Sequence, residues 1–237
     1  MKKLLLLLLC VPMIGFGQNV NIPDANFKAY LVWNTAINTN GDSEIQQSEA
    51  AAFNGSISCS NLSISDLTGI EEFTALTELG CYNNQLTILD VSNNTALTQL
   101  ICDYNHLTCL DVSQNTALTE LNCSENLLEK LNTKNGNWVN GMNIVADTNN
   151  LTCVEVDNIG YANSNWSGSF DSFVTFSTNC NYTNPCNSST VIQEHTTNKE
   201  LLKVTDILGR ETPYRKNTPL FYIYDDGTVE KKLIIKN

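Results

Sequence analysis

Residues 74–136 consist of three similar copies of a 21-residue sequence. The copies read TALTELGCYNNQLTILDVSNN (74–94), TALTQLICDYNHLTCLDVSQN (95–115) and TALTELNCSENLLEKLNTKNG (116–136), with a looser copy before them (53–73) and a partial copy after them (149–157). Repetition with a period in the twenties predicts a solenoid, in which each repeat is one turn. A single turn cannot bury its own leucines, so the turns must stack to form a core.

The leucines fall at fixed positions of the repeat, which predicts continuous apolar columns through the stack. Successive turns are expected to lie about 4.8 Å apart, as strands do in a sheet. No repeat has room for a full helix, so we expect extended segments on two sides of each turn. The expected columns are Leu76, Leu97 and Leu118; Leu79, Leu100 and Leu121; and Leu86, Leu107 and Leu127.

The repeat has the pattern LxxLxCxxNxL, carried in one copy by Leu97, Leu100, Cys102, Asn105 and Leu107. This pattern resembles the signature of the leucine-rich repeat family over about residues 57–157. The resemblance implies a β-rich solenoid, and the copies give a short leucine-rich repeat stack of about five turns. With the terminal segments described below, the predicted fold is this stack with a helical N-terminal cap and a small C-terminal β module. The recurring asparagines (83 or 84, 105 and 126) are expected to satisfy backbone groups at a corner of each turn.

The nine cysteines divide into two groups. Cys59, Cys81, Cys102 and Cys123 share one inward repeat position, which predicts a ladder of reduced, packed thiols. A metal site is the alternative, but parallel strands do not converge four thiolates and the chain has no CxxC pair. Outside the ladder, a disulfide between Cys153 and Cys180 is expected to close the end of the stack, and Cys109 is expected to be unpaired.

The N-terminal residues 1–17 have two lysines, an apolar run and small residues before Gln18, the layout of a secretory signal peptide. The run is too short for a transmembrane span. Residues 18–55 then predict a helical cap, with Phe27, Tyr30 and Leu31 on one helical face and Asp24 as its N-cap. Residues 56–180 are assigned to the solenoid and its C-terminal cap.

Within the cap, NTNGDSEIQQSE (38–49) resembles a calcium-binding EF-hand loop. The resemblance implies calcium ligands at the first, third, fifth, seventh and twelfth positions. An asparagine at the first position and Ser43 in place of the usual glycine depart from the pattern, so a metal-free polar turn remains the alternative. The candidate ligands are Asn38, Asn40, Asp42, Glu44 (through its backbone carbonyl) and Glu49.

Residues 18–198 contain three lysines and no arginine against nineteen acidic residues. Such a body repels phosphate backbones and anionic lipid surfaces, which excludes nucleic-acid binding. A cationic partner or a divalent metal ion would suit this field better.

The C-terminal residues have a different composition. Residues 181–199 are assigned to a polar linker, and residues 200–237 predict a strand at 220–224, a turn at 225–227 and a strand at 229–235. The segments LLKVTDILGRE and PLFYIYDDGTVEKKLIIKN resemble the sorting domain of the type IX secretion system of Gram-negative bacteria. The resemblance implies recognition by that machinery and export across the outer membrane, to the cell surface or the medium. An extra strand pair packed on the solenoid is the alternative.

The sequence offers no catalytic constellation. His106 and His195 are the only histidines, neither lies beside an evident nucleophile and acid, and no hydrolase, phosphate-loop or dinucleotide motif is present. The chain is therefore not expected to be an enzyme, and a two-carboxylate hydrolase has no support.

What remains is the variable outward surface of the first strand of each turn, where exposed aromatic and apolar residues lie among acids. The sequence predicts a non-enzymatic protein-recognition or adhesion module, with a polysaccharide-binding accessory module as the alternative. Scattered surface residues without a partner are the other interpretation of this pattern. The expected interaction face comprises Tyr82, Gln99, Ile101, Asp103, Tyr104, Glu120 and Asn122.

Overall fold

The structure, a computed structural model, describes residues 18–182, 186, 201–205, 220–224 and 229–232. The expected signal peptide lies outside the described residues, as do most of the linker and much of the sorting module. The chain forms two compact units, with the boundary between Asn187 and Ser188. Each unit is described by itself.

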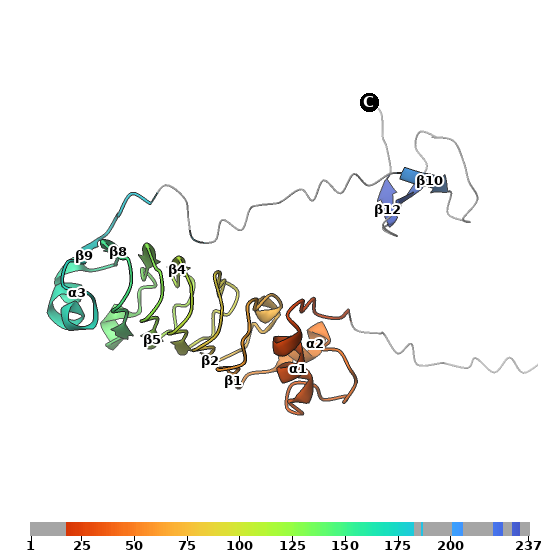
Figure 1. Cartoon of the computed structure of the whole chain (residues 1–237), viewed down its shortest axis with the longest axis horizontal. Coiled ribbons are helices and arrows are strands. Elements are labelled where there is room, and N and C mark those ends of the chain that lie inside the picture. The colour runs from red at the N-terminus through yellow and green to blue at the C-terminus, as the bar shows by residue number, and fades with distance from the viewer. Residues whose placement is uncertain (1–17, 183–185, 187–200, 206–219, 225–228, 233–237) are drawn as a thin grey trace, which may run out of the picture. The chain divides into compact units, whose positions relative to one another are not determined.

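The first unit is a stack of turns that carries two parallel sheets (Figure 1). The first sheet takes one strand from the same position of each successive turn, so that residues one period apart are hydrogen-bonded neighbours. Its strands, in spatial order, are β1 (Ser56–Ser58), β2 (Glu78–Gly80), β3 (Gln99–Ile101), β5 (Glu120–Asn122) and β7 (Asn143–Val145).

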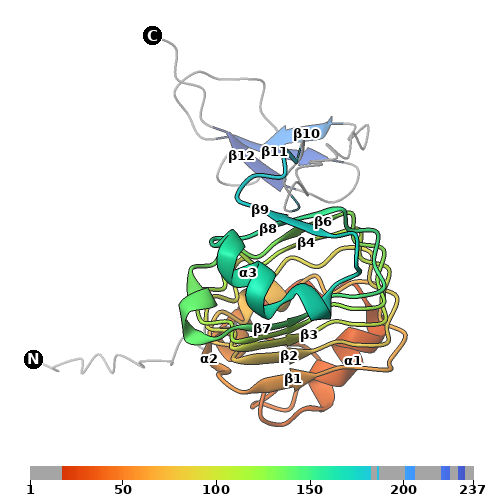
Figure 2. The ribbon, with the colours of Figure 1, turned by 90° about the vertical axis from the view of Figure 1, so that its left-hand side faces the viewer.

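The second sheet lies on another side of the flattened coil (Figure 2). The extended segments expected on two sides of each turn are therefore present. In spatial order its strands are β4 (Cys109–Asp111), β6 (Lys130–Asn132), β8 (Cys153–Glu155) and β9 (Thr175–Ser177), all parallel.

The leucine columns fill the space between the sheets. The central residue of every strand in the first sheet is buried, and Leu79, Leu100 and Leu121 are paired in register. One expected position is wrong: Leu127 is 46% exposed, and Leu128 occupies the column beneath Leu86 and Leu107. The column follows the corner asparagine by two residues in every turn, and Leu128 stands two residues after Asn126.

The corner asparagines bind the backbone of neighbouring turns. Asn105 accepts a hydrogen bond from the Leu86 N–H (3.0 Å) and donates to the carbonyls of Cys81 (3.0 Å) and Cys102 (3.1 Å). Asn84, which is buried, makes the corresponding contacts one turn earlier, whereas Asn83 is exposed. These amides supply partners for backbone groups that the corner removes from water.

A second series of asparagines serves the opposite corner. Asn94 donates to the carbonyls of Ile70 and Phe73, and Asn115 donates to those of Val91 and Asn94. Each turn is thus fixed to its neighbour at two corners.

The N-terminal cap contains α1 (Ala25–Trp33) and α2 (Gln47–Ala52). Asp24 caps α1 by accepting hydrogen bonds from the N–H groups of Asn26 and Phe27, and its other oxygen accepts one from the Ser65 N–H (2.9 Å). Burial opposes ionisation of Asp24, but the hydrogen bonds from Ser65, Phe27 and Asn26 outweigh it and lower its pKa. The carboxylate therefore joins the cap helix to the first turn. A short helix, η1 (Ile70–Glu72), follows in that turn.

The C-terminal end is closed by η2 (Asn137–Asn140), α3 (Ile159–Asn165) and η3 (Ser167–Ser169). Trp166 is buried there, and its indole N–H donates to the Met142 carbonyl (2.9 Å). Its ring packs edge-on against Tyr161. The cap thus covers the last apolar turn, as an open solenoid end requires.

The second unit contains β10 (Leu201–Thr205), β11 (Leu220–Tyr224) and β12 (Val229–Lys232), which form an antiparallel sheet in that order. The hairpin expected from the sequence corresponds to β11 and β12. The turn expected at 225–227, and residues 233–235 of the second expected strand, lie outside the described residues.

Candidate interaction surface

The outward side chains of the first sheet form regular rows across the turns, and we call this surface the first-sheet face. Strand register places Gln99 between Glu78 and Glu120, and Ile101 between Gly80 and Asn122. The Gln99 side-chain amide donates to Glu120 Oε2 (2.6 Å). The structure therefore brings the predicted residues Gln99, Ile101, Glu120 and Asn122 together on one surface.

The remaining predicted residues continue this face just beyond the strands. The Tyr82 carbonyl accepts from the Asn61 N–H, and the Asp103 carbonyl from the Asn83 N–H, so the ladder of turns extends past β2 and β3. Tyr82 is 40% exposed and Tyr104 is 56% exposed. Two aromatic rings are thus available to a partner. Val145 and Asp147, which the sequence analysis did not select, continue the surface at the last turn of this sheet.

Tyr104 has a left-handed backbone, with φ of 53°. The same corner position is left-handed in each turn, and non-glycine residues rarely adopt this conformation unless the surrounding structure imposes it. The hydrogen bonds from the Tyr104 N–H to the Ser124 carbonyl and from the Asn84 N–H to the Tyr104 carbonyl hold it there. The residues in this column are Asn61, Asn83, Tyr104, Glu125 and Thr148.

Asp103 has an unusual environment for a surface carboxylate. Its Oδ1 atom is buried and has no hydrogen-bond partner. Burial raises the pKa of Asp103, and its own backbone N–H offsets part of the rise. A cationic donor that reached this oxygen would relieve the desolvation of the charged form.

The first-sheet face carries negative charge only. The segments that form it (56–61, 78–83, 99–104, 120–125 and 143–148) contain no lysine or arginine. Lys28 is on α1, where its Nζ pairs with Glu44 (2.7 Å), and Lys134 donates to the Thr178 carbonyl. Lys130 lies in β6, in the second sheet. The face is therefore electrostatically suited to a positively charged partner.

The second sheet is crossed by the chain that follows β9. Cys180 forms a disulfide with Cys153, the pair expected from the sequence, and Cys186 forms one with Cys109. Between them the Tyr182 hydroxyl donates to the Cys153 carbonyl (2.6 Å) and accepts from the Leu131 N–H (3.2 Å). The expectation that Cys109 is unpaired is wrong, because the returning chain brings Cys186 to β4.

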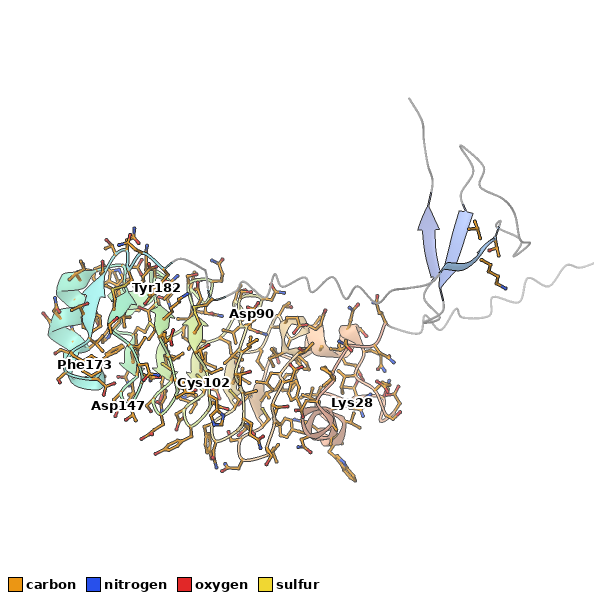
Figure 3. The ribbon with its side chains drawn as sticks, turned by 45° about the horizontal axis from the view of Figure 1, so that its top comes forward. Lys28, Asp90, Cys102, Asp147, Phe173 and Tyr182 are labelled. Atoms are coloured by element: carbon orange, nitrogen blue, oxygen red, sulfur yellow. A yellow bond between two sulfur atoms is a disulfide. The ribbon has the colours of Figure 1, made fainter. Side chains whose placement is uncertain are left out.

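The described residues of the segment 180–186 thus lie along the second sheet and not along the first-sheet face. Figure 3 shows Tyr182 and Asp147 toward opposite sides of the coil. Two described residues of the expected linker, Tyr182 and Cys186, are joined to the solenoid by these contacts. Sequence spacing alone gives no rule that pairs cysteines 77 residues apart.

The four ladder cysteines, Cys59, Cys81, Cys102 and Cys123, are buried and unpaired. Burial raises the pKa of the Cys59 thiol to about 12 and that of Cys102 well above its ordinary value. These thiols remain protonated and pack as small apolar side chains. Figure 3 shows Cys102 within the stack of turns.

The EF-hand-like loop is compact, and its polar groups bind one another. Asn38 donates to the carbonyls of Val32 (3.0 Å) and Asp42 (2.8 Å). Glu49 Oε1 accepts from the Thr39 N–H (2.8 Å), and Glu49 Oε2 accepts from the Gln46 N–H (3.1 Å). A calcium ion would have to replace the donors that now face Glu49. Calcium binding at this loop stays a prediction.

Asn40 and Asp42 belong to the same network. The Asn40 side-chain amide donates to Asp42 Oδ2 (3.0 Å), and Asp42 Oδ1 accepts from the Glu44 N–H (2.7 Å). Within the described ranges no group of three or more histidine, cysteine or acidic side chains is placed to hold a metal ion.

His106 is exposed at a variable corner position, and His195 lies outside the described residues. No helix in the described part of the chain is long and apolar enough to cross a membrane.

The comparisons with known proteins concern the repeat region. Residues 42–150 match the family described as the leucine-rich repeat domain of the endo-beta-N-acetylglucosaminidase EndoS. The repeats are therefore similar to leucine-rich repeats. Internalin J of Listeria monocytogenes serotype 4b (strain F2365) is 40% identical over 82 residues, which are 34% of this chain and 9% of that protein.

A solved structure of the functional domain of InlJ from Listeria monocytogenes, described as including a cysteine ladder, is also similar. It has 39% sequence identity and a TM-score of 0.50, and the match covers 59% of this chain and 31% of that one. The similarity supports the β-rich repeat fold. The chain spans less than a third of either relative, so the similarity concerns a repeat module and not a whole protein.

Proposed function

We propose that this chain is a non-enzymatic recognition module that binds another protein at the cell surface or outside the cell. The observation that carries the proposal is the first-sheet face, which exposes Tyr82 and Tyr104 beside Ile101 on a parallel ladder. Aromatic residues held rigidly lose little entropy on binding, and they are enriched in the cores of protein interfaces. The similarity to internalins, a group of leucine-rich repeat proteins, supports a role in recognition or adhesion.

The face also has the regularity that a binding surface needs. Two asparagine series fix each turn to its neighbour, so the rows of outward side chains are positioned before a partner arrives. Pre-organisation of this kind lowers the entropic cost of association. A catalytic role has no comparable support, since the described residues include no paired nucleophile and base on this face.

The experiment is a triple substitution, Tyr82→Ala with Ile101→Ala and Tyr104→Ala, in the full chain. We expect binding to a partner or host surface to be lost while the melting temperature stays within a few degrees of wild type, because all three side chains are at the surface. The matched control replaces two other exposed apolar side chains, Ile88 and Val139, with alanine; both are 64% exposed. Retained binding in the triple variant, or equal loss in the control, would count against the face.

Polysaccharide binding is the alternative function. The match to a repeat domain described from an endo-beta-N-acetylglucosaminidase gives it some support. Trp33, the sort of side chain that stacks on sugars, is 85% exposed but lies on α1, outside the first-sheet face. A glycan array with the wild type and a Trp33→Ala variant separates the two functions: glycan binding that depends on Trp33 would favour the alternative.

We also propose that residues 200–237 direct the protein to the type IX secretion machinery, after an N-terminal signal at 1–17 has taken it across the inner membrane. The resemblance of the sorting segments supports this, and β10, β11 and β12 are compatible with a small β module. Deletion of 200–237 should retain the chain inside the cell envelope. Mass analysis of the exported wild type should show whether both terminal segments are removed; export without 200–237 would refute the role of the tail.

A further inference from the structure

We propose that the first-sheet face binds a basic polypeptide segment of its partner, and that Asp103 receives an arginine or lysine side chain of that segment. The inference rests on the proposed function and adds the chemistry of the partner. It arises from the charge of the face, the unpartnered oxygen of Asp103 and the lack of a side chain at Gly80.

The charge of the face selects the partner. Glu78, Asp103, Glu120, Glu125 and Asp147 belong to the segments of the first-sheet face, and none of these segments has a basic residue. Residues 18–182 contain only three lysines and no arginine, and all three lysines lie on other elements, α1 and β6 and the turn after β6. The face thus has no internal cation to neutralise it. A partner with positive charge gains from this field during both encounter and docking.

Asp103 supplies the specific contact. Its Oδ1 is buried without a hydrogen-bond partner, and leaving a buried acceptor unsatisfied is unfavourable. The corresponding residues of the neighbouring turns are Tyr82 and Ser124, and the Ser124 hydroxyl donates to Asn122 Oδ1 (2.7 Å) instead of to Asp103. Asp103 as a whole is only partly buried, so a guanidinium or ammonium group of the partner can pair with the exposed part of its carboxylate and neutralise the charge.

The tyrosines make the site better suited to arginine or lysine than to a small inorganic cation. Tyr82 belongs to the turn before Asp103 and Tyr104 is its chain neighbour, and both rings are exposed. A cationic side chain that reaches the carboxylate can also lie against an aromatic ring, which adds a cation–π contact. The described carboxylates do not gather in groups of three as a metal ion requires.

Gly80 gives a partner backbone room to approach. A Cβ built on Gly80 meets nothing closer than the hydroxyls of Ser58 and Ser60, each at 3.7 Å. The neighbouring strand residue is Ile101, so the row presents a large side chain next to small ones. Gly80→Leu should therefore fill this space without strain in the fold, and strand stability should if anything rise, because glycine is unfavourable in strands.

The experiment starts with selection of a random dodecapeptide display library on the immobilised full chain. The tightest peptides are then synthesised in pairs, with each arginine in turn replaced by citrulline, which has nearly the same shape without the charge. For peptides selected with lysine, norleucine takes the place of citrulline. Affinities are measured for wild type, Asp103→Asn and Gly80→Leu, with Glu129→Gln, an exposed acid outside the first-sheet face, as the matched control.

We expect the selected peptides to be basic and one neutral replacement to weaken binding to wild type about tenfold or more. The same replacement should have little further effect on Asp103→Asn, so that the double-mutant cycle assigns the contact. Gly80→Leu should abolish binding, and Glu129→Gln should leave it unchanged.

Three results are unfavourable and distinguishable. Peptides that lose affinity on Gly80→Leu but carry no basic preference, or show no coupling to Asp103, overturn this inference and leave the proposed function standing. Peptides that bind equally to wild type and Gly80→Leu overturn the face itself. Failure to enrich any peptide above the bare support overturns this inference, and the triple substitution at Tyr82, Ile101 and Tyr104 then tests the proposed function by itself.

Discussion

Asn105 provides the sharpest test of what holds the repeats together. In Asn105→Ala, the Leu86 N–H loses its side-chain acceptor at 3.0 Å, and it is buried between turns. The carbonyls of Cys81 and Cys102 each lose one of two asparagine donors, since Asn84 and Asn126 still reach them. An orphaned buried N–H costs about 1–3 kcal/mol, and each further lost hydrogen bond about 0.5–1 kcal/mol.

The total is a destabilisation of about 3 kcal/mol, measured as the free energy of unfolding in urea with both disulfides intact. The control is His106→Ala, the exposed neighbouring residue, which should change stability by less than about 0.5 kcal/mol. Asn149→Ala, at the half-buried last position of the same series, should have an intermediate effect, because fewer surrounding groups are fully removed from water. A loss below about 1 kcal/mol for Asn105→Ala, or equal losses at Asn105 and His106, would refute the reasoning.

Three further predictions concern single side chains. Glu125→Asn should raise the free energy of unfolding by about 0.5–1 kcal/mol in a urea titration, because φ at this position is 51° and asparagine tolerates a left-handed backbone. An unchanged free energy of unfolding would show that the left-handed backbone of Glu125 is not strained. Asp103→Asn should stabilise the fold at neutral pH by at most about 1 kcal/mol, since the carboxyl group is partly open to water. The raised pKa of Asp103 means that the folded wild type holds this proton more tightly than the unfolded chain does, so the wild type loses stability as the pH rises above the ordinary value of 3.8 and through the raised pKa. Below pH 3.8 the advantage of the variant should therefore vanish. A difference in melting temperature that does not change with pH would oppose this. Finally, millimolar calcium should raise the melting temperature of the wild type, and Glu49→Gln should remove the shift, if the EF-hand-like loop binds the ion; an unchanged melt on adding calcium would exclude it.

The repeat could be recognised from sequence because its period is local information. Leu79, Leu100 and Leu121 are buried in register as the 21-residue spacing predicts. The error at Leu127 arose where two leucines are adjacent, so either could satisfy the pattern. Only the position relative to the corner asparagine decides between them. The buried leucine is the one two residues after that asparagine, and its N–H donates to the asparagine of the next turn, as the Leu128 N–H does to Asn149.

Features that depend on where the chain after β9 folds back onto the solenoid could not be predicted in the same way. The Cys109–Cys186 disulfide joins residues 77 positions apart, and the path of the intervening chain decides which cysteines meet. The residues of the first-sheet face follow from strand alternation, but the burial of one oxygen of Asp103 depends on how its neighbours lie. The role of Gly80 could not be predicted, because a missing side chain gives no signal until the surrounding atoms are known.

The disulfide between Cys109 and Cys186 determines where mechanical force would enter the repeat stack. Tension applied to the tail is transmitted through Cys186 to the strand that contains Cys109, ahead of the final turns and their cap. The intervening residues lie within a covalently closed loop and are shielded from that pull while the bond is intact. A protein held by its C-terminal end therefore carries load through its middle turns without peeling from the end. Reduction of this bond alone would move the point at which force enters to Cys153, which the second disulfide joins to Cys180, and residues 110–152 would no longer be shielded.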